Sequence, residues 1–408
     1  MLGVIAGLFA GILLGTISGL VPGIHSNTIA GIVAALSVPL TAVFEGDGVC
    51  AMIVSMMIVH TFVDAVPSTF LGVPDPDTVL SVLPAHKLCL DGNGQEAIRV
   101  SALGSIWGFI FCLPLFVLFV FALPSVQGYV DWGVGLVILL AAGLLIVFSK
   151  APAWSFAVFM VSGILGIYAM QFSYFSYGVF GIGEILLPLL TGLFGLPVLF
   201  TSMKSVAKPA EQKFTGLLVS RGQVLKNGMK GAVAGAIVGW LPGFSSGTAN
   251  ALLAVRRSSD FEKTEPREYL LSTSAANTAN AVLGLAALYA VGRMRSGAMV
   301  TLASFELPSI YLLVLVAGIA ALAGYVVTIC VSKFSREIMG LNQRILAGIV
   351  CVFLVGMTVV FCGIFGIMIL ILAFLVGILP GMVGIPRIFG MGAIMLPVML
   401  FTLGILNF

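Results

Sequence analysis

The chain has 408 residues, of which 60% are hydrophobic and only 9% are charged, with a formal net charge of +3. Soluble domains carry about 25% charged residues because their surfaces face water. This composition therefore excludes an ordinary soluble fold. The small and scattered net charge also gives no reason to expect a nucleic-acid partner.

Long apolar runs occupy most of the chain, and they are too long and too unbroken for the short alternating segments of a β-barrel. We predict an all-α polytopic membrane protein with about ten to thirteen hydrophobic segments, located in the cell membrane. The first run lacks the basic region and cleavage site of a secretory leader, so we expect it to be retained. The run at 345–379 is long enough for two spans. The runs are 2–21, 27–43, 50–72, 98–123, 130–149, 152–171, 178–200, 231–254, 271–292, 307–332, 345–379 and 388–406.

A basic stretch separates two halves that share a sequence frame. Residues 15–28 and 235–248 match at seven positions with a constant offset of 220, in a Gly-x-x-x-Gly-x-x-Pro-Gly pattern. Internal duplication with interrupted helices is typical of secondary transporters. We therefore predict two inverted repeats, at 1–200 and 231–408, with Pro-Gly-broken helices or re-entrant hairpins.

The stretch between the repeats, 201–230, is predicted to be a cytoplasmic linker because basic residues favour the cytoplasmic side. A basic patch that binds a partner would lie on the same side. Further basic residues at 256–267 indicate that 231–254 enters the membrane and returns as a hairpin. The basic residues of the linker are Lys204, Lys208, Lys213, Arg221, Lys226 and Lys230, against one acid, Glu211.

The repeated Pro-Gly pairs predict a substrate site. Proline removes a backbone donor and glycine tolerates unusual dihedrals, so each helix should break there. Where helix resumes, free N–H groups and the positive end of the helix dipole can bind an anion. Simple proline kinks are the alternative. The predicted substrate-binding residues are Pro22, Gly23, Ser26, Asn27, Thr28, Pro242, Gly243, Ser245, Ser246, Thr248 and Asn250.

The glycines that precede each break recur at every fourth residue. Small residues at this spacing let helices approach closely, so we interpret them as packing surfaces rather than ligand contacts. They are Gly11, Gly15 and Gly19 in the first half and Gly231, Gly235 and Gly239 in the second.

A second pair of segments carries polar residues inside apolar runs. His60 and Asp64 share one helix face, and their surroundings are similar to those of Asn277 and Asn280 with a slip of one residue. Ionisable groups in a membrane are expensive and are usually functional. We predict that these four residues couple transport to H⁺ or Na⁺. The alternatives are that Asp64 caps a break at Pro67 and that the asparagines form interhelical hydrogen bonds.

No sequence signal favours enzymatic chemistry. The chain contains no His-Glu-x-x-His, Gly-x-Ser-x-Gly or nucleotide-binding loop. The six cysteines are widely spaced, so neither a metal site nor a disulfide is expected. We predict a protein that is not an enzyme and has no cofactor. A channel remains an alternative, although duplicated helix breaks favour a single central site.

The paired Pro-Gly frames, together with Leu71-Gly-Val-Pro74, residues 83–97 and Ser274-Ala-Ala-Asn277-Thr-Ala-Asn280, resemble the TctA family. Its members are the large permease subunits of tripartite tricarboxylate transporters. The resemblance implies a permease for an organic anion such as a carboxylate, of the compact, stand-alone branch. It also implies a small membrane subunit and a periplasmic binding protein as partners, with a homodimer as one possible assembly.

Residues 241–248 are in addition similar to the Pro-Gly-x-Ser-Gly-Gly-Thr stretch of bacterial polyprenyl-phosphate translocases. A lipid-linked phosphate is therefore the alternative cargo, and membrane lipids are contacts of the chain in either reading.

Overall fold

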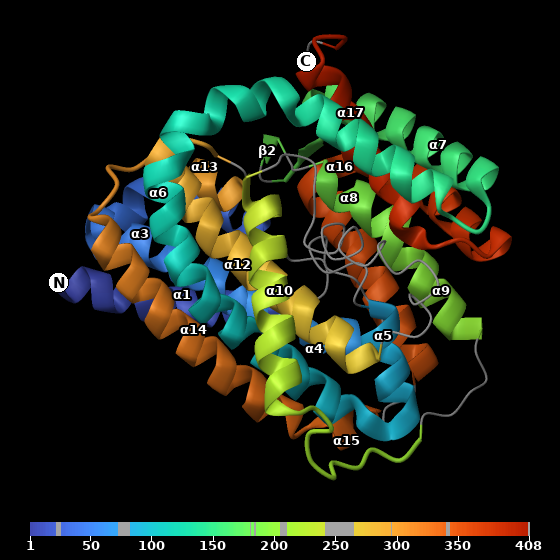
Figure 1. Ribbon diagram of the computed structural model, residues 1–408, viewed down its shortest axis with the longest axis horizontal. Coiled ribbons are helices and arrows are strands. Elements are labelled where there is room, and N and C mark those ends of the chain that lie inside the picture. Colours follow the sequence, from blue (N-terminus) through green and yellow to red (C-terminus); the bar gives the residue numbers. More distant parts are fainter. Residues whose placement is uncertain are drawn as a thin grey trace.

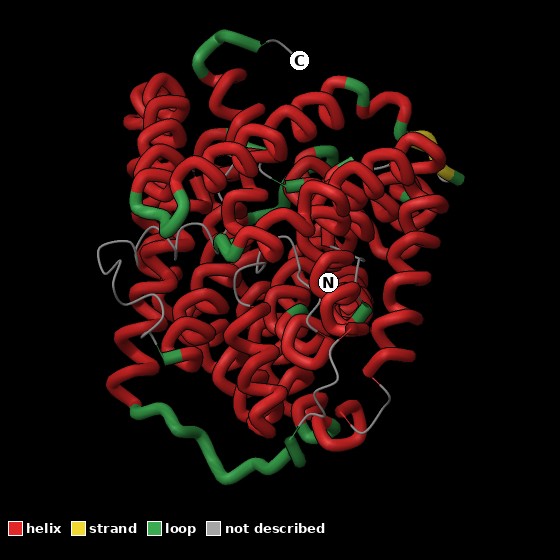
Figure 2. Tube along the Cα trace, turned by 90° about the vertical axis from the view of Figure 1, so that its right-hand side faces the viewer, coloured by secondary structure: helices red, strands yellow, loops and turns green. Residues whose placement is uncertain are grey.

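A computed structural model describes residues 1–21, 26–71, 82–179, 181–182, 185–204, 210–240, 265–294, 296–339 and 343–406. Within these ranges, seven helices are long and apolar enough to cross a membrane. The prediction of an all-α polytopic membrane protein is confirmed, and Figure 2 shows how completely helices make up the described chain.

The helices of the first half are α1 (Leu2–Leu20), α2 (Ser26–Ala35), α3 (Ser37–Val63), α4 (Ala65–Leu71), α5 (Val82–Leu88), α6 (Gly94–Val147), α7 (Pro152–Gln171), α8 (Leu186–Leu190) and α9 (Leu196–Lys204). Those of the second half are α10 (Arg221–Trp240), α12 (Pro266–Val291), α13 (Gly297–Ala303), α14 (Ile310–Ser332), α15 (Ser335–Met339), α16 (Gln343–Val383) and α17 (Gly392–Thr402). Short π-helical turns are η2 (Cys89–Asn93) and η4 (Thr191–Gly195), and 3₁₀ turns are η3 (Ser173–Phe175) and η5 (Arg387–Met391). The strands β1 (Tyr177–Gly178) and β2 (Gly181–Ile182) form a small antiparallel hairpin.

One long helix, α6, differs from the predicted segments, and another, α16, agrees with them. α6 joins the runs predicted separately at 98–123 and 130–149 into 54 residues, with Pro114 and Pro124 inside it. At 1.5 Å per residue it is about 80 Å long, far more than one bilayer crossing. Figure 1 shows α6 turning across the top of the molecule. In α16, Gly363 has φ 60° and divides the helix near its middle, which agrees with two spans.

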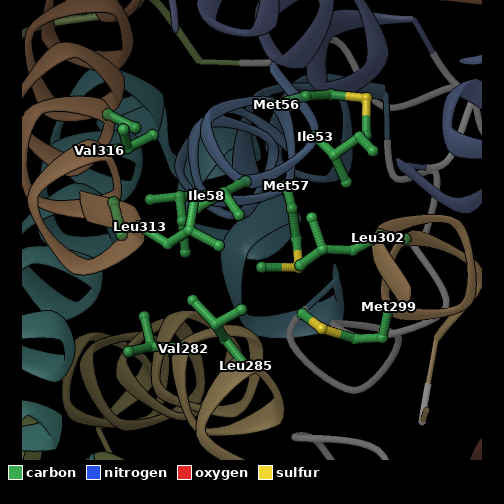
Figure 3. Close-up of a cluster of buried hydrophobic side chains, with 14 of the residues drawn as sticks. Ile53, Met56, Met57, Ile58, Val282, Leu285, Met299, Leu302, Leu313 and Val316 are labelled. Carbon is green, nitrogen blue, oxygen red and sulfur yellow. The ribbon is translucent and has the colours of Figure 1, made fainter. Parts of the chain in front are cut away.

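The described hydrophobic core has two large clusters, which divide the molecule into two lobes, and three smaller ones. The first lobe contains α1 to α3, the earlier part of α6, and α12 to α14. The second contains the end of α6 with α7, α8, η4, α16, η5 and α17. Figure 1 shows the first lobe on the left and the second on the right. Figure 3 shows the first cluster, where Met57 and Ile58 of α3 face Val282 and Leu285 of α12.

The α10 and α12 helices contribute to both lobes. Ala232 of α10 packs in the first cluster and Ala234 in the second. Ala276 of α12 also packs in the second cluster, although most of α12 belongs to the first. These two helices therefore lie at the boundary between the lobes.

The described part of the predicted linker is folded onto the first half. Residues 210–220 have no regular secondary structure, and α10 already begins at Arg221, inside the stretch predicted as linker. The Ala210 and Lys213 N–H groups donate to the carbonyl oxygens of Leu90 and Gly92 at 2.9 and 3.0 Å. The described part of the linker is therefore hydrogen-bonded through its backbone to η2.

Candidate functional site

The repeated glycines lie at close contacts with neighbouring helices in both halves. A methyl group on Gly15 would lie 2.5 Å from the Met56 carbonyl oxygen of α3. A methyl group on Gly235 would lie 2.6 Å from the Ala276 carbonyl oxygen of α12. The prediction that these glycines serve helix packing is confirmed.

These contacts also fix how the two helix pairs correspond. A methyl group on Gly19 would meet Val63 Cβ at 2.7 Å, and one on Gly239 would meet Leu283 Cβ at 3.2 Å. Met56 and Ala276, like Val63 and Leu283, are separated by 220 residues, the same offset as the glycines. His60 therefore corresponds to Asn280. The predicted alignment of His60 with Asn277, through a slip of one residue, is wrong because backbone packing keeps the original register.

Asp64 and Asn277 meet at the contact between the two halves. α3 ends at Val63, and the Asp64 N–H donates to the His60 carbonyl oxygen at 3.0 Å. The Asn277 Nδ2 group donates to Asp64 Oδ2 at 2.8 Å. Asp64 is 3% exposed and Asn277 is 2% exposed. A carboxylate from one half is thus held by an amide from the other, away from bulk water.

Hydroxyl groups extend this contact along α3, α6 and α12. Thr61 Oγ1 lies 3.0 Å from Thr278 Oγ1, and Ser101 Oγ lies 2.6 Å from Ser274 Oγ. Ser105 Oγ donates to the Thr61 carbonyl oxygen at 3.3 Å. We call this set of buried groups the polar seam; it consists of Thr61, Asp64, Ser101, Ser105, Ser274, Asn277 and Thr278.

The hydroxyl members of the seam were missed by the sequence interpretation. Ser101 and Ser105 are four residues apart, as are Ser274 and Thr278. This spacing puts each pair on one helix face and was the available signal. Serine and threonine are common in membrane helices. Their spacing therefore could not show that two such faces meet.

His60 links the seam helix α3 to the last turn of α1. His60 Nδ1 lies 2.9 Å from Ser18 Oγ, which also contacts the Gly15 carbonyl oxygen at 3.1 Å. His60 and Ser18 are both buried. The predicted ionisable pair thus has Asp64 directed to α12 and His60 directed to α1. Asn280 is only partly buried and lies near Gly239 of α10.

The first predicted helix break is present. α1 ends at Leu20 and α2 begins at Ser26, so helix resumes after the Pro22-Gly23 pair. Ser26 is buried. Asn27 Oδ1 accepts from the Ala298 N–H at 3.3 Å and so holds the start of α13 against α2. This contact gives Asn27 a structural task next to the predicted binding role.

The second break lies mostly outside the described residues. α10 ends at Trp240, two residues before Pro242. Thr28 belongs to α2 by its backbone, and nothing is described of its side chain. The remaining predicted binding residues lie outside the described ranges; they are Pro22, Gly23, Pro242, Gly243, Ser245, Ser246, Thr248 and Asn250.

A second buried charged contact joins the halves near the linker. Arg267 Nη2 lies 2.8 Å from Glu96 Oε2, and Arg267 Nε donates to Glu96 Oε1 at 2.9 Å. The Leu218 N–H also donates to Glu96 Oε1 at 2.7 Å. This contact ties the start of α6, the linker and the start of α12 together. In the described parts of the chain, no three His, Cys, Asp or Glu side chains are grouped so that they could hold a metal ion.

Comparison with known proteins agrees with this architecture. The tripartite tricarboxylate transporter TctA family matches residues 5–392. An uncharacterized protein of Methanocaldococcus jannaschii is 29% identical over 299 residues, covering 72% of this chain and 68% of its own length. No solved structure matches. The family match does not favour the alternative of a lipid-phosphate translocase. The chain is a multi-pass membrane protein that belongs to the TctA family of tripartite tricarboxylate transporters.

Proposed function

We propose that this protein is a secondary transporter that moves an organic carboxylate across the membrane and is coupled to H⁺ or Na⁺ through Asp64. The observation that supports this most directly is the buried hydrogen bond between Asp64 of the first half and Asn277 of the second. The family supplies the class of protein, a permease component of a tripartite transporter.

The position of the carboxylate suits a coupling role. Alternating access moves one structural unit against another around a central site. Asp64 is hydrogen-bonded across such a contact, so its surroundings change whenever the two halves separate. A buried carboxylate can be neutralised by a proton or by a bound cation, and either event would change its bond to Asn277. Ion binding and movement of the halves are therefore linked through one side chain.

The anion is proposed to bind at the two Pro-Gly breaks, with Ser26 in the first half and Ser246 in the second. Support comes from the repeat itself and from the resumption of helix at Ser26. Each charge-assisted hydrogen bond contributes about 1.5–3 kcal/mol. The double variant Ser26→Ala/Ser246→Ala should thus weaken binding of the carboxylate more than about tenfold.

As a TctA protein, the chain is proposed to act with a small membrane subunit and a periplasmic binding protein. The direct test of coupling is uptake of radiolabelled citrate into proteoliposomes under imposed H⁺ or Na⁺ gradients. We expect Asp64→Asn to abolish gradient-driven uptake while citrate binding, measured by calorimetry, remains. The fold should survive because an asparagine oxygen can still accept from Asn277.

The matched control is Asp91→Asn, which removes an exposed carboxylate on η2. Its uptake should equal that of the unmodified protein. Gradient-driven uptake that persists in Asp64→Asn would exclude Asp64 from coupling. Absence of both binding and uptake of any di- or tricarboxylate by the unmodified protein would refute the proposed function as a whole.

A further inference from the structure

Arg387 stands at the start of η5, in the connection between α16 and α17. Gly384, with φ 74°, and Pro386 end the preceding helix, and α17 begins at Gly392. Arg387 directly precedes the hydrophobic run predicted at 388–406. The structure places it in a turn inside the second lobe.

The turn lies beside the middle of two apolar segments. Ser162, at the centre of α7, donates to the Phe389 carbonyl oxygen at 3.2 Å. A methyl group on Gly390 would lie 3.1 Å from the ring of Phe194, which belongs to η4 between α8 and α9. Both neighbours are central residues of their apolar segments. The turn that carries Arg387 therefore lies level with the middle of two apolar segments rather than with their ends.

The side chain of Arg387 is half-buried, and one nitrogen of its guanidinium has no protein acceptor among the residues that the structure describes. Its Nη1 atom is buried and makes no hydrogen bond there. Arg267, by contrast, meets the carboxylates of Glu96 and Glu265 at 2.8 and 2.9 Å. A charged side chain within the membrane is costly unless it is paired. The unpaired nitrogen of Arg387 can therefore bind an added anion that is not part of the described protein.

We propose that Arg387 binds a carboxylate group of the transported anion; this rests on the proposed function. Arginine presents a planar fork of donors that matches the two oxygens of a carboxylate, whereas backbone N–H groups offer single donors. Arg387 supplies the full positive charge that the predicted Pro-Gly sites lack.

The position of the turn relative to the seam supports this assignment. The second cluster contains Ile388 and Phe389 of the turn and also Ala276, the residue before Asn277. The turn and the Asp64–Asn277 pair therefore belong to packing units that share α12. Movement of the second lobe against α12 would change access to Arg387 and the surroundings of Asp64 together.

A phosphate or other acidic group of a membrane lipid offers the same oxyanion chemistry. An arginine that binds lipid extends its terminal nitrogens toward the headgroup region. Here Nη1 is fully covered by protein. This burial favours an anion that enters between helices over one that remains at the lipid surface.

The test uses the full-length protein in nanodiscs made only of phosphatidylcholine, with citrate, succinate and malonate as calorimetric probes. We expect Arg387→Gln to weaken binding of the preferred carboxylate at least about tenfold. Arg387→Lys should lose less because it keeps the charge without the fork. The control, Arg336→Gln, removes a 76% exposed arginine and should leave affinity unchanged.

A second arm measures phosphatidylglycerol retention by the same variants, without any carboxylate. Selective loss of lipid retention in Arg387→Gln, with carboxylate affinity intact, would assign the arginine to lipid and overturn the proposal. Equal carboxylate affinities in Arg387→Gln and the unmodified protein would overturn it as well, and would leave the proposed function standing. If the unmodified protein bound none of the probes, both the Arg387 proposal and the proposed transport function would be refuted.

Chemical modification of the unmodified protein provides a readout that does not depend on folding of a variant. Phenylglyoxal reacts with arginine, and mass spectrometry reports the modified fraction of Arg387. We expect the preferred carboxylate to slow this modification several-fold at saturation, whereas modification of Arg336 should not change. Equal rates at Arg387 with and without the carboxylate would contradict the proposal.

Discussion

The α1/α3 pair and the α10/α12 pair use the same packing but carry different polar groups. In both pairs, glycines of the first helix press on backbone carbonyls of the second at positions related by 220 residues. Yet α3 carries His60 and is followed directly by Asp64, whereas α12 carries Asn277 and Asn280. A close backbone contact leaves no room for a side chain larger than glycine. A polar side chain elsewhere on the helix can differ between the halves without disturbing that contact.

The difference explains how the two halves can meet at one site. Asp64 corresponds to Gly284, and Asn277 corresponds to Met57, by the offset that the glycines define. Neither residue has a polar equivalent in the other half. The carboxylate and the amide are therefore complementary across the contact, and two buried carboxylates never face each other. Such asymmetry leaves one ionisable group to respond to the coupling ion.

The largest expected effect on stability tests two corresponding charged positions, one in α3 and one at the start of α12. Arg267 of α12 corresponds to Asp47 of α3, but Arg267 pairs with the buried Glu96 and Asp47 is exposed. Breaking a buried pair leaves an uncompensated charge, so Glu96→Gln should lower the free energy of unfolding by about 3–5 kcal/mol. Asp47→Asn should change it by less than about 0.5 kcal/mol.

Chemical or thermal unfolding in detergent, followed by circular dichroism, measures both variants. A third variant, Glu265→Gln, removes the partly exposed second partner of Arg267 and should cost no more than about 1 kcal/mol. Equal stability of Glu96→Gln and Asp47→Asn would mean that the second half gains nothing from its tie to the linker.

Gly→Ala substitutions at corresponding helix contacts should lower the stability of the protein by similar amounts in the two halves. Gly15→Ala and Gly235→Ala each place a methyl group against a backbone carbonyl, which should cost about 1–3 kcal/mol of stability. Gly143→Ala is the control because nothing lies near the added methyl in α6. It should be neutral or stabilising by about 0.5–1 kcal/mol, since alanine favours helix. A neutral Gly235→Ala beside a costly Gly15→Ala would show that the shared frame does not pack alike.

Much of this arrangement could be predicted from the sequence because it depends on local chemistry. Composition indicated membrane helices, and proline with glycine indicated the end of α1 before Pro22. The four-residue spacing of glycines indicated helix contacts. Each of these signals acts through the backbone within one or two turns.

Contacts between distant segments could not be predicted in the same way. The alignment of His60 with Asn277 followed residue type, whereas the structure follows backbone packing. No role was predicted for Arg387, because the packing of its turn depends on α7, more than 200 residues earlier. Glu96 and Arg267 are 171 residues apart in the sequence, and only the fold brings them together. The predicted repeat boundaries and the binding roles at the Pro-Gly breaks stay predictions.

The smallest expected effect tests whether the seam is a direct link between the halves. Thr61 Oγ1 donates to the Ile58 carbonyl oxygen at 2.8 Å, so its contact with Thr278 requires Thr278 to be the donor. Thr61→Val would leave the Thr278 donor buried without its acceptor, at a cost of about 1–3 kcal/mol. Thr278→Val removes only the donor and should cost less, about 0.5–1.5 kcal/mol.

The double variant Thr61→Val/Thr278→Val should be more stable than the sum of the single effects predicts, because no hydroxyl then remains unpaired between the two helices. Unfolding of the four proteins in the cycle gives the coupling free energy, which we expect to be about 0.5–1.5 kcal/mol. Thr328→Val is the control, since Thr328 in α14 donates to the Gly324 carbonyl oxygen of its own helix and to no other group that the structure describes. Combined with Thr278→Val, it should show no coupling. Strict additivity in the Thr61–Thr278 cycle would mean that these hydroxyls contribute separately, and that α3 and α12 are joined at the seam by Asp64 and Asn277 without their help.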